Sequence, residues 1–172
     1  LIHTLFTHRN SWRSLDMTEI NYWLMKSEPD VYGIHDLKKE LTTLWDGIRN
    51  YQARNYMRTM CIGDQVFFYH SNCKSPGITG FMKVIETGII DPTQFNPESK
   101  YYDQKSSKAN PRWDCVKLKY VGTFYNFLTL KEIKDNYSEK ELAIVRKGNR
   151  LSIIPISQKI AIDMLNKLGE LR

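Results

Sequence analysis

Short runs of apolar and aromatic residues, separated by turn residues, predict a chain built largely of strands. The run YWLMK at 22–26 has the composition of a buried strand, and Pro29 follows soon after its end. The other predicted strands are 63–71, 78–90, 113–124 and 150–156. We expect Gly80 and Gly88 to bend or bulge the long strand at 78–90.

Helical spacing and capping residues predict the remaining elements. An apolar stripe predicts a helix over 33–43 and consists of Ile34, Leu37, Leu41 and Leu44. Thr129 and Ser138 are each followed three residues later by a glutamate, so each has the form of a capping box and predicts a helix start. Ser157 predicts the N-cap of a final helix. The apolar side of that helix consists of Ile160, Met164, Leu165 and Leu168.

The order of these elements favours an α+β fold rich in strands. Strands and helices do not alternate regularly, which argues against a doubly wound parallel sheet. We therefore predict a small bent sheet or pseudo-barrel flanked by helices. The segment 91–112 holds three prolines and no apolar period, and predicts an excursion over the surface. A chain of 172 residues is long enough for one such core.

The first sixteen residues differ from the rest of the chain. They carry Arg9 and Arg13 and no acidic residue before Asp16, and Met17 follows. An organelle presequence has a similar composition, whereas a secretory signal would need an uninterrupted apolar core. We favour the alternative, in which translated upstream or added sequence precedes a natural start at Met17, because the periodic pattern of the fold begins only at Tyr22. We expect residues 1–16 to form a leader outside the fold, and 17–172 to form a single domain.

Charge and composition restrict the classes of partner. Lys and Arg number 25 against 19 Asp and Glu, a formal net charge of +6 that favours an anionic partner. No run approaches the roughly 20 apolar residues of a membrane span, so we expect no membrane partner. Three cysteines do not suggest a disulfide framework. Cys61, His70 and Cys73 lack an evident fourth zinc ligand, so we predict no metal and no cofactor.

Two segments place charged groups and aromatic rings together. At 23–29 (WLMKSEP) a buried strand ends in a cation, a hydroxyl and a carboxylate. At 45–58 (WDGIRNYQARNYMR) three arginines alternate with three aromatic residues, an arrangement that can neutralise phosphates while a ring or an amide contacts a base. The alternatives are an ion-paired turn for the first segment and a solvated amphipathic helix for the second. Standard phosphate-loop, dinucleotide-binding, zinc-protease and serine-hydrolase motifs are absent.

These segments resemble the signature blocks of a known family. WLMKSEP, WDGIRNYQARNYMR, GDQVFFYHSN, GITG, NPRWDCVKL and RLSIIPIS are similar to blocks of the EVE domain family, part of the PUA-like superfamily. The resemblance runs from Tyr22 to about Leu168. It implies a compact pseudo-barrel with a concave pocket that reads modified bases in DNA or RNA, notably modified cytosines, and no established enzymatic activity.

The resemblance also implies a set of site residues. The implied pocket for the modified base consists of Lys26, Ser27, Glu28, Asn50, Tyr51, His70, Ser71, Trp113, Ile154 and Pro155. Our candidates for phosphate contact are Arg49, Arg54 and Arg58. We expect DNA or RNA with modified bases as the partner of a monomer, in the cytoplasm of a bacterium or in a nucleus.

The expected mechanism is base flipping. The modified base would leave the stack and be held between an aromatic plane and an apolar wall, while polar groups read its Watson–Crick edge. One alternative is an enzyme that acts on a small nucleotide-like ligand, with His70 or Glu28 as acid or base. Another is a basic module that binds nucleic acid without regard to base modification.

Overall fold

The computed structural model describes residues 19–172, so the predicted leader at 1–16 lies outside the described residues. The strands are β1 (Tyr22–Ser27), β2 (Thr42–Leu44), β3 (Gln65–His70), β4 (Gly77–Ile90), β5 (Asp114–Thr129) and β6 (Ile153–Ile156). The helices are α1 (Ile34–Glu40), α2 (Tyr51–Thr59), α3 (Leu130–Asn136) and α4 (Gln158–Leu168), with short 3-10 helices η1 (Pro92–Phe95) and η2 (Ala143–Val145).

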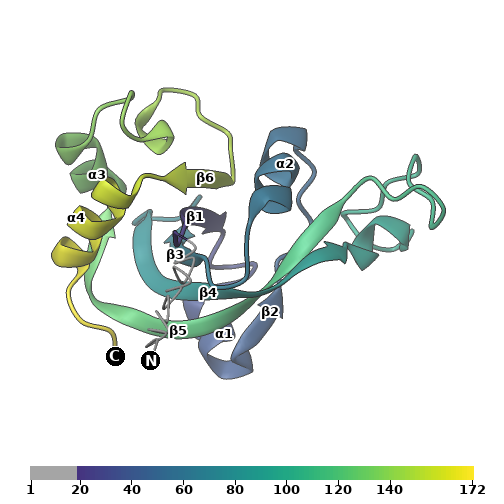
Figure 1. The fold of residues 1–172 in the computed structure, drawn as a ribbon, viewed down its shortest axis with the longest axis horizontal. Helices are drawn as coiled ribbons and strands as arrows, with labels where there is room; N and C mark the ends of the chain where they lie inside the picture. The colour runs from purple at the N-terminus through teal and green to yellow at the C-terminus, as the bar shows by residue number, and fades with distance from the viewer. Residues whose placement is uncertain (1–18) are drawn as a thin grey trace, which may run out of the picture.

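The described strands form one mixed sheet in the order β2-β5-β4-β3-β1-β6. Strands β1 and β3 are parallel, and the other neighbouring pairs are antiparallel. The long strands β4 and β5 bend together under the rest of the sheet and extend beyond it as an arm that carries η1 (Figure 1). In the described part of the chain the edge strands β2 and β6 do not pair, so the sheet bends without closing into a barrel. The α+β prediction is confirmed.

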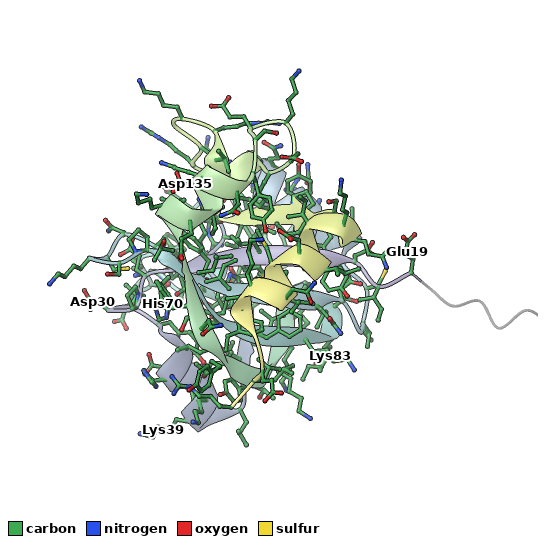
Figure 2. All side chains as sticks on the ribbon, turned by 90° about the vertical axis from the view of Figure 1, so that its left-hand side faces the viewer. Glu19, Asp30, Lys39, His70, Lys83 and Asp135 are labelled. Carbon is green, nitrogen blue, oxygen red and sulfur yellow. The ribbon has the colours of Figure 1, made fainter. Side chains whose placement is uncertain are left out.

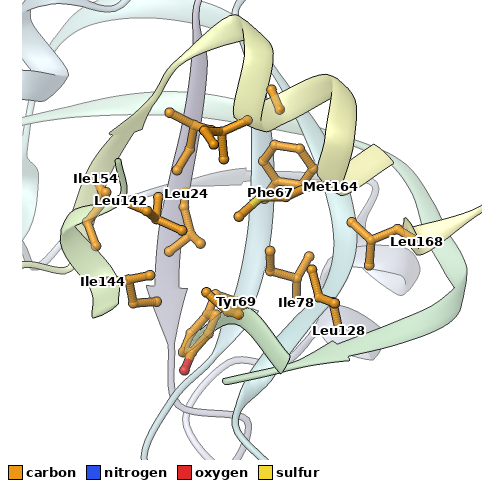
Figure 3. Close-up of a cluster of buried hydrophobic side chains, with 14 of the residues drawn as sticks. Leu24, Phe67, Tyr69, Ile78, Leu128, Leu142, Ile144, Ile154, Met164 and Leu168 are labelled. Carbon is orange, nitrogen blue, oxygen red and sulfur yellow. The ribbon is translucent and has the colours of Figure 1, made fainter. Parts of the chain in front are cut away.

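Both faces of the central strands are buried. Leu24 and Phe67 belong to an apolar cluster covered by α3 and α4, which Figure 2 shows from the α4 side and Figure 3 in close-up. Their neighbours Met25 and Phe68 belong to a second cluster, covered by α1 and α2. Because successive side chains of a strand point to opposite faces, this double burial explains the nearly continuous apolar runs of β1 and β3.

The irregularities expected in the long strand are present. The pairing of β4 with β5 shifts register at Gly80 and again between Glu86 and Ile89, around Gly88. A Cβ on Gly80 would lie 2.2 Å from Cδ1 of Ile34. The absence of a side chain at Gly80 therefore lets α1 pack directly against the sheet.

The first predicted helix is too long. It ends at Glu40, and Leu41 has a φ of 68° and is 60% exposed, so Leu41 and the exposed Leu44 do not continue the apolar stripe. The chain leaves the helix because 42–44 pairs with β5, and because the Tyr120 amide donates to the Leu41 carbonyl at 2.8 Å. Tertiary pairing overrides the helical spacing here.

Two of the three capping predictions give helices. Thr129 and Ser157 cap α3 and α4, each accepting a hydrogen bond from a first-turn amide. At Ser138 the reciprocal hydrogen bonds with Glu141 form, at 2.8 and 3.3 Å, but only a turn and η2 follow. The predicted helix at Ser138 is therefore wrong.

Replacing Leu41 by glycine should stabilise the fold. A side chain at positive φ costs about 1 kcal/mol relative to glycine, and this leucine contributes little burial in return. Because glycine also gives the unfolded chain more conformational freedom, we expect Leu41→Gly to raise the free energy of unfolding by less than about 1 kcal/mol in urea denaturation. The matched variant Leu44→Gly, in a strand, should lower it. A loss of stability in Leu41→Gly would contradict backbone strain at this position.

Candidate nucleic-acid interface

A pocket of about 590 Å³ opens where the end of β1 faces the segment after β2. The β1 side contributes Lys26, Ser27, Glu28, Val31, Tyr32 and Ser71. The facing side contributes Thr43, Leu44, Trp45, Asp46, Gly47 and Ile48, and the rim is completed by Lys100, Tyr101, Arg150 and Ser152. The volume lies in the range of small-molecule sites. The lining combines aromatic rings, aliphatic groups and both signs of charge.

Backbone and hydroxyl hydrogen bonds fix the β1 side of the pocket. The Lys26 amide donates to the Ser152 carbonyl at 2.9 Å, and the Ser71 amide donates to the Ser27 carbonyl at 2.9 Å. The Ser27 hydroxyl donates to the Tyr32 carbonyl at 2.7 Å, which holds the following loop against the strand. These bonds tie the ends of three strands into one wall.

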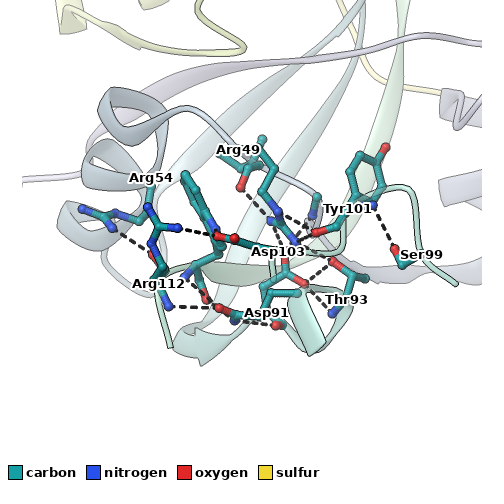
Figure 4. Close-up of polar contacts among 12 residues, drawn as sticks. Arg49, Arg54, Asp91, Thr93, Ser99, Tyr101, Asp103 and Arg112 are labelled. Carbon is teal, nitrogen blue, oxygen red and sulfur yellow. Dashed lines mark hydrogen bonds and ion pairs between the residues drawn. The ribbon is translucent and has the colours of Figure 1, made fainter. Parts of the chain in front are cut away.

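The opposite wall is held by a buried carboxylate, Asp91 (Figure 4). It accepts hydrogen bonds from the Gly47 amide at 2.9 Å and from Nη1 of Arg49 at 2.8 Å. It also accepts from the amide and hydroxyl of Thr93 at 2.8 and 2.6 Å. Burial alone would raise the pKa of Asp91, but these hydrogen bonds outweigh it and hold the pKa below its ordinary value.

Gly47 allows an aromatic ring to close the pocket rim. Its φ is +78°, and a Cβ would lie 2.6 Å from the ring of Tyr101. The Tyr101 carbonyl in turn accepts from Nε of Arg49 at 2.8 Å. The same arginine therefore bonds to Asp91 and positions the segment that carries Tyr101.

The pKa values of two pocket residues, Asp46 and Lys26, are shifted. Burial raises the pKa of Asp46, and the neighbouring Asp91 carboxylate adds to this shift while Arg49 opposes it. Burial lowers the pKa of Lys26. Partly desolvated charges interact more strongly with a ligand than exposed ones. Asp46 can accept a hydrogen bond from an amino group, and Lys26 can donate to a carbonyl or ring nitrogen.

The predicted pocket residues divide into two groups. Lys26, Ser27, Glu28 and Ser71 line this pocket. The structure places Asn50, Tyr51, His70, Trp113, Ile154 and Pro155 outside its lining.

Three of the six outlying residues lie on or beside α2 and have structural partners. The Asn50 side chain accepts from the Ala53 amide at 3.0 Å and is the N-cap of α2. Tyr51 stacks on Trp113 with a centroid separation of 4.9 Å. Trp113 is 5% exposed and its indole donates to Asp103 at 2.7 Å, so it is a packing residue here.

The other three outlying residues lie on the sheet. His70 accepts a hydrogen bond from the Ile34 amide at 3.1 Å. Ile154 is fully buried in the cluster under α4, and Pro155 is exposed on the edge strand β6. Successive residues of a strand face opposite ways, so Ile154 and Pro155 cannot form one wall.

The candidate phosphate contacts are largely engaged within the protein. Arg49 is held by Asp91 as described, and Arg58 pairs with Asp114. Arg54 donates to the Arg112 carbonyl at 2.8 Å and lies 4.7 Å from the centroid of the Tyr51 ring. It forms no ion pair among the described residues, so its charge is not neutralised within the described chain.

Most of the chain matches a protein-family model. The model described as EVE domain matches residues 21–166 of the chain. The chain belongs to the EVE domain family.

Relatives of this EVE domain include proteins named thymocyte nuclear protein 1. The human (Homo sapiens) protein is 40% identical over 157 residues, which cover 81% of this chain and 70% of that protein. The protein of Danio rerio is 42% identical over 154 residues, covering 78% and 66%.

Two solved structures show the same fold. The crystal structure of a protein from Pseudomonas syringae has a TM-score of 0.82 and 42% identity, covering 86% of this chain and 99% of that chain. The crystal structure of human THYN1 protein in complex with 5-methylcytosine-containing DNA has a TM-score of 0.80 and 38% identity, covering 88% and 99%.

Several residues of the EVE domain pocket could not be identified from the sequence. Trp45 and Asp46 belong to a segment considered for phosphate contact, but their place in a pocket depends on pairing between β2 and β5. Lys100 and Tyr101 come from the segment predicted as a mere surface excursion. The length of this segment is the sequence feature that could have indicated a functional role, because long loops without regular structure are often functional.

No helix in residues 19–172 is long and apolar enough to cross a membrane. Cys61, His70 and Cys73 do not form a metal-binding group, and no other such group occurs in that part of the EVE domain.

Removing the Asp91 charge should destabilise the EVE domain. Asp91→Asn leaves the largely buried Arg49 without its carboxylate, so we expect a loss of about 3 kcal/mol in the free energy of unfolding. The control Asp114→Asn removes the partner of the more exposed Arg58 and should cost less than about 1 kcal/mol. Urea denaturation at neutral pH measures both, and equal losses would contradict a special role for Asp91.

The ion pair between Asp91 and Arg49 also predicts that stability depends on pH. The pKa of Asp91 is lower in the folded than in the unfolded chain, so its contribution is complete above the ordinary aspartate pKa. That contribution is lost as the pH falls through the depressed value. The stability difference between wild type and Asp91→Asn should therefore shrink in acid.

Proposed function

We propose that this EVE domain binds DNA containing 5-methylcytosine and holds the flipped base in the pocket at the end of β1. The observation that carries the proposal is the pocket itself, in a fold shared with human THYN1 protein in its complex with 5-methylcytosine-containing DNA. The positive net charge favours the same class of ligand.

The lining suits the chemistry of cytosine. Tyr101 provides aromatic surface for stacking of the flipped base, and Trp45, which is 7% exposed, lines the same pocket. Asp46 provides the carboxylate that cytosine requires, because carboxylates accept from its exocyclic amino group. Lys26 and the Ser71 hydroxyl supply donors for the ring nitrogen and carbonyl acceptors of the same edge.

The methyl group would contact the apolar part of the lining. Val31, Leu44 and Ile48 are the aliphatic side chains available to it. Burial of one methyl contributes about 0.8 kcal/mol, which corresponds to a preference of about fourfold over cytosine. Base flipping costs a few kcal/mol, so most of the affinity must come from the base edge, stacking and phosphate contacts.

The arginines have different roles in this proposal. Arg54 remains a phosphate contact, since it has no carboxylate partner among the described residues. Arg49 and Arg58 act through their ion pairs to hold the pocket and α2 in place. We propose that the domain binds as a monomer. A DNA ligand requires a compartment that contains DNA, which is the cytoplasm of a bacterium or the nucleus of a eukaryote.

Titration with matched oligonucleotides tests the proposed function. Short DNA and RNA carrying cytosine, 5-methylcytosine or 5-hydroxymethylcytosine at one position are added at two salt concentrations, and tryptophan fluorescence reports binding. Trp45 is the expected reporter because it lines the pocket. We expect the tightest binding for DNA with 5-methylcytosine and a preference over cytosine that survives added salt. Equal affinity for all bases that disappears with salt would refute a base-reading pocket.

Asp46→Asn tests how the base is recognised. A hydrogen bond to a charged acceptor contributes about 1.5 kcal/mol or more, so we expect at least about tenfold weaker binding of 5-methylcytosine DNA. The exposed Asp30 lies outside the pocket lining, and Asp30→Asn should bind like the wild type.

The same variant predicts a pH effect on binding. Wild-type affinity should fall as Asp46 becomes protonated, at a higher pH than for an ordinary aspartate because burial raises its pKa. In Asp46→Asn this component should be absent, leaving only the titration of cytosine itself. Identical pH profiles for the two proteins would remove Asp46 from the recognition mechanism.

A further inference from the structure

A second pocket, of about 530 Å³, lies between β1, α3 and the loop that follows η2. Its basic side chains are Lys26, Lys134, Arg146 and Lys147. The remaining lining is Tyr69, Leu130, Ile144, Val145, Gly148 and Asn149, so it contains no carboxylate. A concave site with cations and no acid is suited to an anion.

The cations of this pocket are not neutralised by the protein. None of the four forms an ion pair among the described residues. Arg49, Arg58 and Arg112 differ, because each pairs with an aspartate. Figure 2 shows long side chains with nitrogen ends extending from the loop beyond Asp135. Four cations therefore line this pocket without an ion-pair partner among the described residues.

The loop that carries the cations is held in place by its own hydrogen bonds. The Asn149 amide group donates to the Ala143 carbonyl, and its oxygen accepts from the Leu151 amide at 2.7 Å. Nε of Arg146 donates to the Glu139 carbonyl at 3.1 Å. Such a preorganised loop loses less conformational freedom when it binds a ligand.

Lys26 connects the two pockets. Its side chain contributes to the lining of both, and its ammonium group lies 6.0 Å from the centroid of the Tyr69 ring. A nucleotide whose base occupies the first pocket would therefore present its backbone toward the second. This is the only lysine or arginine shared by the two linings in the described chain.

We propose that the second pocket binds a phosphodiester of the same DNA strand, immediately next to the flipped nucleotide. This inference rests on the proposed function of the first pocket. Lys134 and Lys147 would contact the phosphate oxygens, and Lys26 would bridge base and backbone. The contact adds affinity without distinguishing cytosine from 5-methylcytosine, because it touches no base.

A phosphate-by-phosphate experiment tests this site. The probe is a short DNA with one 5-methylcytosine, in which each phosphate near that base is replaced in turn by an uncharged methylphosphonate. The variant is Lys134→Gln with Lys147→Gln. The control, Lys140→Gln with Lys159→Gln, removes the same charge from exposed positions outside both pockets. Binding is measured for the wild type and both double variants at several salt concentrations.

We expect one methylphosphonate beside the modified base to weaken wild-type binding about fivefold. The Lys134→Gln, Lys147→Gln protein should bind DNA with an unmodified backbone about fivefold more weakly than the wild type does. The slope of its log affinity against log salt concentration should be smaller by about 0.7 to 0.9. The methylphosphonate that weakens wild-type binding should cause no further loss of affinity in this variant. The control should keep the wild-type pattern. Independent, additive effects at every phosphate, or a variant that matches the control, would overturn the proposal.

The same data separate this inference from the proposed function. The preference for 5-methylcytosine over cytosine reports on the first pocket, and coupling to a single phosphate reports on the second. A retained preference without coupling refutes only the phosphate site. A wild-type protein without any preference refutes the proposed function itself.

Discussion

The buried carboxylate of Asp91 is the contact on which the geometry of the first pocket depends. It binds the Gly47 amide and the Arg49 guanidinium in one segment and Thr93 in another, more than forty residues away in sequence. A buried carboxylate is stable only when its oxygens accept hydrogen bonds or pair with a cation, so the segments that supply these donors must be in place at the same time. The pocket wall and the end of β4 that leads into η1 therefore form as one unit. Arg49 links this unit to Tyr101, and so to the rim.

The fold could be predicted well where burial and local chemistry agree. The aromatic and aliphatic runs of β1 and β3 specify strands, and the caps Thr129 and Ser157 specify helix starts. Prediction failed at Leu41, whose helical spacing competes with strand pairing to β5. It also failed at Ser138, where a satisfied cap is not followed by an apolar helical face. At Leu41 a contact distant in sequence decides the local structure, whereas at Ser138 the residues after the cap decide it.

The site was harder to predict than the fold for the same reason. Lys26, Ser27 and Glu28 could be proposed from the sequence because they follow a buried strand, and they line the first pocket. Asp46 and Tyr101 reach the pocket only through tertiary contacts. An arginine beside aromatic residues has the same sequence pattern whether it contacts a phosphate or a buried aspartate, so the sequence alone makes Arg49 a candidate for phosphate contact. Only the position of Asp91, distant in the chain, distinguishes the two roles.

The unpaired edge strands of the sheet affect whether molecules aggregate at high concentration. Unpaired edge strands can recruit strands of other molecules and start aggregation. Here β2 is only three residues long, and β6 carries Pro155, which has no amide hydrogen to donate to an incoming strand. Neither edge offers a long, regular template for a second copy. The bent sheet can thus stay open without joining its neighbours into a continuous intermolecular sheet.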